Sequence, residues 1–201
     1  MKSMRMSCDP KNHARVRLFE QHELRPVRYR FTMQTQLTTP IKEPGMLSDL
    51  AIIHWTEQQS ESARDAFNRA FESHWGLPAI HEDMWPQRFV GVPQFRPDLS
   101  WLVLSEHEVI GLCINWGPSM DAENALSKRG WIEAIGVVPE WRGRGVADVM
   151  MTRSLNSFLG EGLSYASLDV DTQNSTGALQ LYEKHGFAPS KREAVFEKLL
   201  D

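Results

Sequence analysis

The loop 142–147, with the sequence Arg142-Gly143-Arg144-Gly145-Val146-Ala147, has residue types and a spacing suited to binding a pyrophosphate. Glycine adopts backbone conformations closed to other residues and lacks a Cβ, so successive N–H groups can converge on phosphate oxygens. An apolar strand precedes the loop and a helix follows it, which directs the positive end of the helix dipole at the same anion. Two alternatives stay open: a plain strand-to-helix turn, and arginines that are only solvated surface residues.

A second segment, 174–187, follows a strand-like stretch and is typical of a capped helix that ends at Gly186. Its sequence is Asn-Ser-Thr-Gly-Ala-Leu-Gln-Leu-Tyr-Glu-Lys-His-Gly-Phe. Together and in this order, the two segments resemble the GNAT superfamily of acyl-CoA-dependent N-acetyltransferases, over residues 50–200. The segments 70–76 and 95–99 also look like the acceptor-side region of the branch that contains mycothiol synthase. The resemblance implies a GNAT fold and acetyl-CoA as cosubstrate.

The resemblance also implies roles for single residues. Tyr182 matches the tyrosine that in many GNAT enzymes donates a hydrogen bond to the leaving sulfur, although a core tyrosine is an alternative. Asn174 matches a position whose side chain often contacts the pantetheine arm, and a helix N-cap is the alternative. The N–H groups near Val137 and Val138 can polarise the thioester carbonyl if the strand splays or bulges there, and Pro139 prevents regular pairing beyond this point.

Glu133 is the candidate general base. An amine with a pKa near 10.4 is about three units above neutral pH, so its nucleophilic form is disfavoured by about 4–5 kcal/mol and its proton needs an acceptor. Glu133 is the only charged residue within the apolar strand 131–138, and it would act through a water molecule. The alternative is a glutamate at the sheet edge that pairs with an arginine.

Composition bounds the class of protein. The chain has 201 residues, 41% of them hydrophobic, and a net charge of −4, so it can bury a full core and gives no electrostatic reason to expect nucleic acid as a partner. Cys8 and Cys113 match no metal-ligand spacing, so no metal is expected. No apolar run reaches the length of a membrane span, and residues 1–10 lack the core of a signal peptide. A cytoplasmic location is therefore expected.

Hydrophobic spacing predicts the order of the elements. The pattern indicates an amphipathic helix over 56–75, a broken helix or loop over 80–90, a hairpin formed by 101–104 and 109–116, and a polar loop over 119–129. Strands over 131–138, 163–171 and 194–199 then alternate with helices over 145–159 and 175–185. The fold class is mixed α/β: a mostly antiparallel twisted sheet, splayed at its central strand and flanked by helices.

The N-terminal segment contains an apparent internal repeat. Residues 17–26 align without gaps on 180–189, with four identical pairs, and Phe19 stands where the second copy has Tyr182. We expect residues 1–37 to be the helix and strand that end a second, non-catalytic GNAT-like domain, residues 38–48 to be a linker, and 49–201 to be the acetyltransferase domain. Chance similarity is the alternative. A lone strand must bury one face, either on its own chain or in a homodimer, and the homodimer is favoured.

These observations predict an N-acetyltransferase that moves an acetyl group from acetyl-CoA directly to a primary amine of a small molecule or peptide. The alternative of a different class is an acyl-CoA-binding sensor or partner module without turnover. Residues 76–98 and 117–129, which would select the acceptor, carry no motif.

Overall fold

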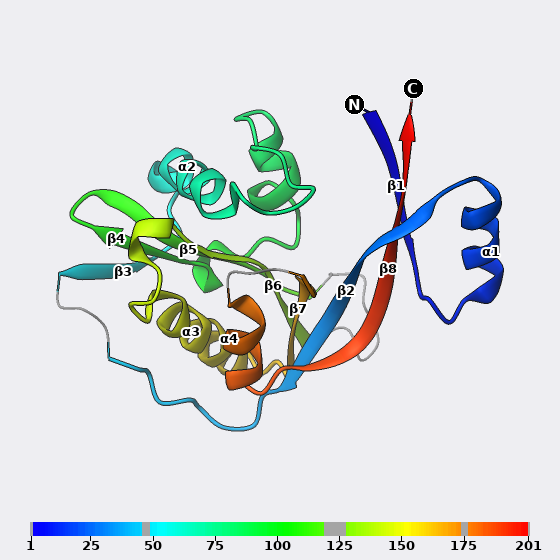
Figure 1. Ribbon diagram of the computed structural model, residues 1–201. Helices are drawn as coiled ribbons and strands as arrows, with labels where there is room; N and C mark the ends of the chain where they lie inside the picture. Colours follow the sequence, from blue (N-terminus) through cyan, green and yellow to red (C-terminus); the bar gives the residue numbers. More distant parts are fainter. Residues whose placement is uncertain (1, 46–48, 119–127, 174–176, 201) are drawn as a thin grey trace. The chain divides into compact units, whose positions relative to one another are not determined.

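The computed structural model describes residues 2–45, 49–118, 128–173 and 177–200 (Figure 1). Its described strands form an eight-stranded, mostly antiparallel sheet in the order β1-β8-β2-β7-β6-β5-β4-β3, which confirms the predicted mixed α/β fold. The chain divides into two compact units. The larger unit comprises residues 35–167, and the smaller unit comprises residues 1–34 together with 168–201.

The larger unit is built on four antiparallel strands. These are β3 (Leu50–His54), β4 (Trp101–Ser105), β5 (Glu108–Trp116) and β6 (Arg129–Val137). The predicted hairpin is confirmed, and it turns through Glu106 at φ 54°. The strand β7 (Tyr165–Asp171) begins in this unit and pairs with the start of β6 in parallel. Most of the predicted polar loop, residues 119–127, lies outside the described residues.

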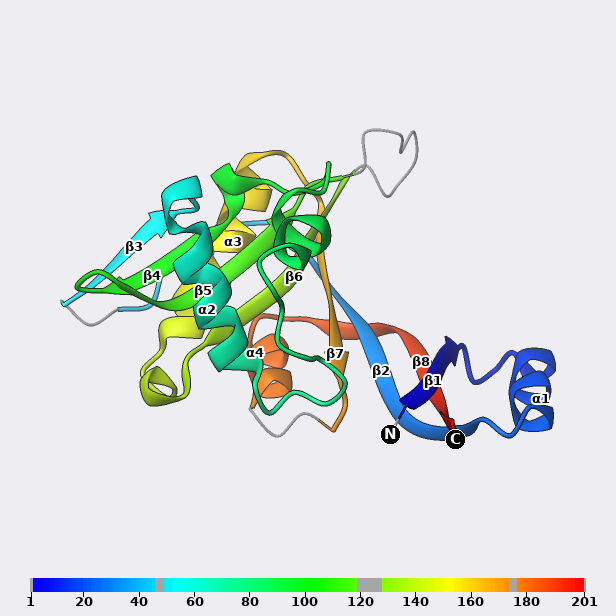
Figure 2. The same ribbon diagram turned by 90° about the horizontal axis from the view of Figure 1, so that it is seen from above.

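Two helices cover opposite faces of this sheet. The helix α2 (Ser60–Phe71) packs on β5 and β6, and α3 (Val146–Gly160) packs on β4, β5 and β6 from the other side (Figure 2). A Cβ added to Gly136 would meet the side chains of α2, whereas one added to Gly111 would meet those of α3. The faces are opposite because Gly111 pairs with Val137, the neighbour of Gly136, and neighbouring residues of a strand point to opposite sides.

The boundaries of these elements differ modestly from the predicted ones. The helix predicted over 56–75 is a 3₁₀ turn (Glu57–Gln59) followed by α2, which ends at Phe71. Its predicted apolar face is buried through Ala63, Ala66, Phe67 and Ala70, while Phe71 and Trp75 are half-buried. The stretch predicted as a broken helix contains one π-helical turn, Pro86–Val90, and a 3₁₀ turn follows at Pro97–Leu99.

The segment that connects the two units lies along α3. Residues 38–45 contain no helix or strand, as expected of a linker. The Asn156 side chain accepts a hydrogen bond from the backbone N–H of Ile41 and donates one to its carbonyl, both at 2.8 Å. Arg153 pairs with Glu43 at 2.8 Å. The segment is therefore fastened to the helix by bonds that its composition did not predict.

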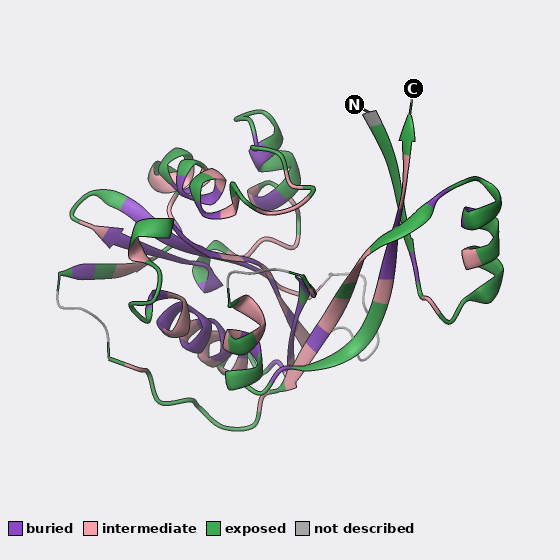
Figure 3. Ribbon diagram, in the orientation of Figure 1, coloured by how far each residue is buried: buried purple, intermediate pink, exposed green. Residues whose placement is uncertain are grey.

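The smaller unit contains β1 (Lys2–Cys8), α1 (His13–Gln21), all but the last two residues of β2 (Arg25–Gln36), α4 (Ala178–Lys184) and β8 (Ala188–Leu200). Both β1 and β2 pair with β8 in antiparallel fashion (Figure 1). The N-terminal strands thus pair with a strand of their own chain, which is one of the two hosts expected for them, and the favoured homodimer stays a prediction. A buried cluster of Cys8, Phe19, Leu24, Ala194 and Phe196 fastens α1 to these strands, while the rest of α1 stays largely exposed (Figure 3).

The sequence repeat extends over three elements of the structure, a strand, a helix and a second strand. A constant shift of 163 positions, which takes Arg25 to Ala188, also takes Lys2–Cys8 onto Tyr165–Asp171, so β1 corresponds to β7 and β2 to β8. The helix ends match as well: Glu23 at φ 66° corresponds to Gly186 at φ 77°. The corresponding capping bonds are Leu24 N–H to Phe19 O and Phe187 N–H to Tyr182 O, both 3.0 Å.

The pairing of β2 with β8 is symmetric under the same shift. Arg30 lies opposite Glu193, which is its equivalent in the second repeat. Tyr29 pairs with Ala194 and Phe31 pairs with Arg192, and the shift of 163 positions converts each of these two pairs into the other. The irregularities at Val27 and Ser190 also correspond. Since β1 neighbours β8 and β7 neighbours β2, each β-α-β repeat has exchanged its last strand with the other. The sequence did not predict β1 or this exchange.

Candidate active site

The strand β6 carries the candidate base. The register between β5 and β6 shifts between Ile114 and Asn115, which pair with Ala134 and Ile132, so that Glu133 is the extra residue of a bulge. The Trp131 Nε1–H donates to the Glu133 Oε2 at 3.0 Å, and Glu133 is half-buried. The bulge is therefore at Glu133, whereas β6 near Val137 continues in regular pairing with β5 and lies beyond its pairing with β7.

The end of β6 pairs with β5 along one edge, and its other edge lies beyond the pairing with β7. Val138 N–H donates to the Ile110 carbonyl at 3.0 Å, so this N–H belongs to the β5–β6 ladder and cannot also polarise a thioester. In an antiparallel pair, the backbone N–H and C=O groups of successive residues point alternately toward and away from the partner strand. The backbone groups of Val137 and Ile135 therefore point away from β5. Within the described residues, β6 pairs with β7 only through Arg129, Gly130 and Trp131, so the N–H groups of Ile135 and Val137 lie beyond that ladder.

The predicted pyrophosphate loop has the expected backbone. A 3₁₀ turn (Pro139–Trp141) leads into it, Gly143 has φ 73°, and Gly145 has φ 80° as the first residue before α3. An ideal Cβ on either glycine would meet no atom within 4 Å, so the space beside the loop is open. The first intrahelical bond runs from Val149 N–H to the Gly145 carbonyl at 3.1 Å, so earlier N–H groups, including those of Val146 and Ala147, point out of the helix end.

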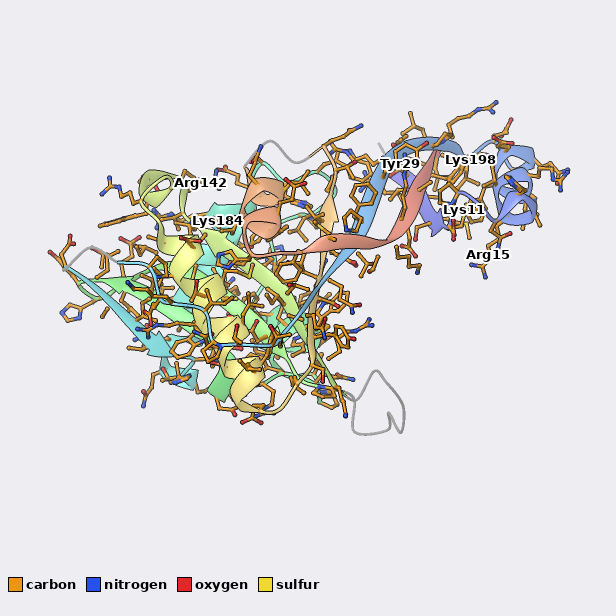
Figure 4. The ribbon with its side chains drawn as sticks, turned by 90° about the horizontal axis from the view of Figure 1, so that it is seen from below. Lys11, Arg15, Tyr29, Arg142, Lys184 and Lys198 are labelled. Carbon is orange, nitrogen blue, oxygen red and sulfur yellow. The ribbon has the colours of Figure 1, made fainter. Side chains whose placement is uncertain are left out.

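The two arginines of the loop are used differently. The Arg144 guanidinium is exposed and lies 4.6 Å from the centre of the Trp141 ring. Arg142, which is labelled in Figure 4, instead donates from Nε to the Val137 carbonyl at 3.1 Å and from Nη2 to the Ala70 carbonyl at 2.8 Å. At least two nitrogens of its guanidinium therefore bind protein backbone, and no sequence pattern predicts these contacts.

In the smaller unit, Tyr182 lies on α4 with only 7% of its surface exposed. Its ring centre is 6.2 Å from that of Phe187, and its carbonyl accepts the capping bond that ends the helix. Asn174, the predicted pantetheine contact, lies outside the described residues. Among the described His, Cys, Asp and Glu side chains, no group of three or more is arranged to hold a metal ion.

A residue missed by the sequence reasoning is Gly136. An ideal Cβ there would lie 2.8 Å from Phe71 Cε2 and 3.0 Å from Ala70 Cβ, so α2 packs closely on β6 one residue before Val137. A glycine inside an apolar strand is a signal of such a close approach. This signal was present in the sequence and could have located the contact.

Residues 60–187 match the Acetyltransferase (GNAT) family, so the chain belongs to this family of N-acetyltransferases. It is 31% identical over 162 residues to mycothiol acetyltransferase of Thermobispora bispora, covering 77% of this chain and 52% of that protein. It is 28% identical over 96 residues to N-alpha-acetyltransferase MAK3 of Arabidopsis thaliana, covering 48% of each. The chain thus spans about half the length of these curated relatives.

The fold is shared with solved GNAT structures. A GCN5-related N-acetyltransferase from Sphaerobacter thermophilus superimposes with a TM-score of 0.77 at 23% identity, over 98% of this chain and 59% of that one. A tandem GNAT protein from the clavulanic acid biosynthesis pathway gives 0.71 at 10% identity, over 98% and 63%. Among the described helices, none has the length and hydrophobicity that crossing a bilayer would need.

Proposed function

We propose that this chain transfers an acetyl group from acetyl-CoA directly to a primary amine. The observation that carries the proposal is the loop 142–147, which combines two left-handed glycines, open space at both Cβ positions and the start of α3, inside the family match. These features suit a pyrophosphate, because a side chain at either glycine would enter the space that the phosphates need. The N–H groups of Gly143 to Ala147 would hold it, and Arg144 would add charge.

The free edge of β6 suits the pantetheine arm and the thioester. Ile135 and Val137 present N–H groups there, and an extended arm could pair with them as an added strand. The Val137 N–H would donate to the carbonyl oxygen as negative charge develops on it, which stabilises the tetrahedral intermediate. Acetyl-CoA supplies the activated acyl group, and the protein supplies alignment and electrostatics.

Glu133 would accept the proton of the attacking amine through a water molecule. Its bulge lies on the same strand as Val137, and the bond from the Trp131 indole fixes one carboxylate oxygen. A positioned base of this kind contributes typically 10²–10⁴-fold to the rate. The alternative of a structural glutamate predicts that removing the charge lowers stability and leaves the pH profile of turnover unchanged.

Tyr182 would donate a hydrogen bond to the sulfur of CoA as it leaves. The repeat supports a specific role for the Tyr182 hydroxyl. The equivalent residue, Phe19, packs in a buried cluster and has no hydroxyl, so packing at this position does not need one. A purely structural position would accept phenylalanine equally well. The contact with Asn174 and the interpretation of residues 1–37 as the end of a second GNAT-like domain also remain proposals, the latter supported by the three-element repeat.

The acceptor is proposed as a primary amine of a small molecule or a peptide. The names of the relatives point to both kinds, mycothiol acetyltransferase to a small molecule and N-alpha-acetyltransferase to a protein N-terminus. An α-amine has a pKa near 7.8 and needs less help to lose its proton than a lysine amine near 10.4. A homodimer also remains a prediction, which sedimentation of the full chain tests.

The test is thiol release from acetyl-CoA against a panel of amines and N-terminal peptides, alongside calorimetric binding of CoA. Turnover with at least one amine supports the enzyme. Binding without turnover across the panel supports the alternative, an acyl-CoA-binding module. Tighter binding of ADP-containing nucleotides that lack pantetheine than of CoA would contradict both.

A further inference from the structure

Arg142 bridges two elements of the larger unit. Its guanidinium donates to Ala70 O in the last turn of α2 and to Val137 O at the end of β6. The last carbonyls of a helix have no intrahelical partner and carry partial negative charge, so a bound guanidinium satisfies and stabilises them. Lysine could not reproduce this geometry, because its ammonium is a point charge without the planar fork of arginine.

The bonds from Arg142 hold the last turn of α2 at the point where this helix packs on Gly136. Ala70 and Phe71 sit so close to Gly136 that this position has no room for a Cβ. A second tie runs from Arg69 to Glu108 and, at 3.2 Å, to Glu140 in the turn before the loop. The Arg69 side chain is 44% exposed and its bonds to both glutamates are exposed, so solvent weakens them. The two bonds of Arg142 are partly buried, although the residue as a whole is exposed, so they are the stronger constraint.

Phe71 therefore lies beside the proposed thioester position on the face of β6 opposite α3. CoA would be held at the start of α3, so an amine reaches the thioester from the α2 side. The Phe71 ring is half-buried and is supported by Phe67, with ring centres 4.6 Å apart, and by His74 at 6.0 Å. Its remaining surface would form an aromatic wall for the acceptor.

We propose that Arg142 is a positioning residue that fixes the last turn of α2, so that Phe71 forms the acceptor-side wall next to Val137, and that it is not a ligand of the pyrophosphate. This rests on the proposed function for the identity of the site. The acceptor it favours is a primary amine whose neighbouring carbon atoms are apolar and pack on the Phe71 ring.

The test compares Arg142→Lys with the matched control Arg144→Lys, which alters the other arginine of the same loop, whose guanidinium lies over the Trp141 ring. Three quantities are measured: the Kd of CoA by calorimetry, amide hydrogen exchange over residues 70–75, and kcat and KM for an accepted amine. Arg142→Lys should raise exchange over 70–75 at least tenfold and raise the KM of the amine about tenfold, with the Kd of CoA changed less than threefold. Arg144→Lys should leave exchange over 70–75 unchanged.

The opposite pattern overturns the inference: a large rise in the Kd of CoA for Arg142→Lys with unchanged exchange over 70–75 would make Arg142 a phosphate ligand. If Arg142→Lys does not fold, Phe71→Ala tests the wall by itself, and an unchanged amine KM would refute it. Exchange is measured without CoA or amine, so it reports on the bridge even if the wild-type chain fails to bind CoA, which would instead refute the proposed function.

Discussion

The pyrophosphate loop makes its sharpest prediction at Gly145. Replacing it with alanine forces a side chain into the left-handed region, at φ 80°, which costs about 1–2 kcal/mol. No atom lies within 4 Å of the new Cβ, so no steric penalty adds to this. For a chain of this size, each kcal/mol lowers the Tm by about 2–4 °C, and the variant should remain folded.

Gly145→Glu adds a charge beside the proposed phosphates. Two like charges about 4 Å apart repel by about 4 kcal/mol at an effective dielectric constant near 20, which corresponds to about a 10³-fold loss of affinity. The matched control is Gly162, which follows α3, has φ 75° and has equally open surroundings. Gly162→Ala should lose about as much stability as Gly145→Ala, whereas Gly162→Glu should lose somewhat more than Gly145→Glu, because a negative charge is unfavourable at the C-terminal end of α3 and favourable at its N-terminal end. Gly162→Glu should keep its affinity for CoA.

The assay is titration calorimetry with CoA, run beside urea unfolding of all four alanine and glutamate variants. We expect similar losses of unfolding free energy for the two alanine variants, and a loss of CoA affinity for the variants at Gly145 alone. A folded Gly145→Glu protein whose Kd for CoA equals that of Gly162→Glu would refute the phosphate loop, since only Gly145 borders the space proposed for the phosphates.

Further predictions concern the catalytic groups, the buried thiol and the N-terminal segment. Tyr182→Phe should lower kcat about 10²-fold or more with little change in CoA affinity, measured by steady-state kinetics and calorimetry. Glu133→Gln should steepen the pH dependence of turnover, with activity partly recovered at high pH, where more amine is unprotonated. Burial raises the pKa of the Cys113 thiol to about 12, so below that pH it stays protonated in the folded chain, and iodoacetamide should modify it only after unfolding. Deleting residues 1–34 should destabilise the chain in thermal unfolding because both edges of β8 lose their partners; a deletion variant as stable as the full chain would contradict the pairing in cis.

The local features of this fold were predictable from sequence. The left-handed glycines of the loop and the hairpin around residues 106–107 depend on a few adjacent residues, so their sequence patterns suffice. The buried face of α2 followed from helical spacing for the same reason. In each case, the energetic cause and the sequence signal occupy the same short segment.

Contacts with backbone groups were not predictable. The bonds from Arg142 end on carbonyls of Ala70 and Val137, and every residue carries a carbonyl, so no residue type marks the acceptor. The bond from Val138 N–H to Ile110 depends on the register between two strands. The first half of β8 was also missed, because residues 188–192 are exposed and show no alternation of apolar and polar side chains.

The exchange of last strands between the two repeats could not be predicted even after the repeat had been recognised. Since β2 and β8 occupy equivalent positions in the two repeats, either could pair with β1 or with β7 through similar backbone hydrogen bonds, so backbone pairing alone does not select between the two arrangements. One pair of residue types in the two repeats nevertheless fits the symmetric register. In two identical repeats, the residue at the centre would face its own copy and a charged side chain there would be repelled. Arg30 lies opposite Glu193 at this centre, and opposite charges across a strand pair are favourable. The charge difference at the one position that symmetry pairs with itself therefore favours the pairing of β2 with β8 over the pairing of either strand with its own copy.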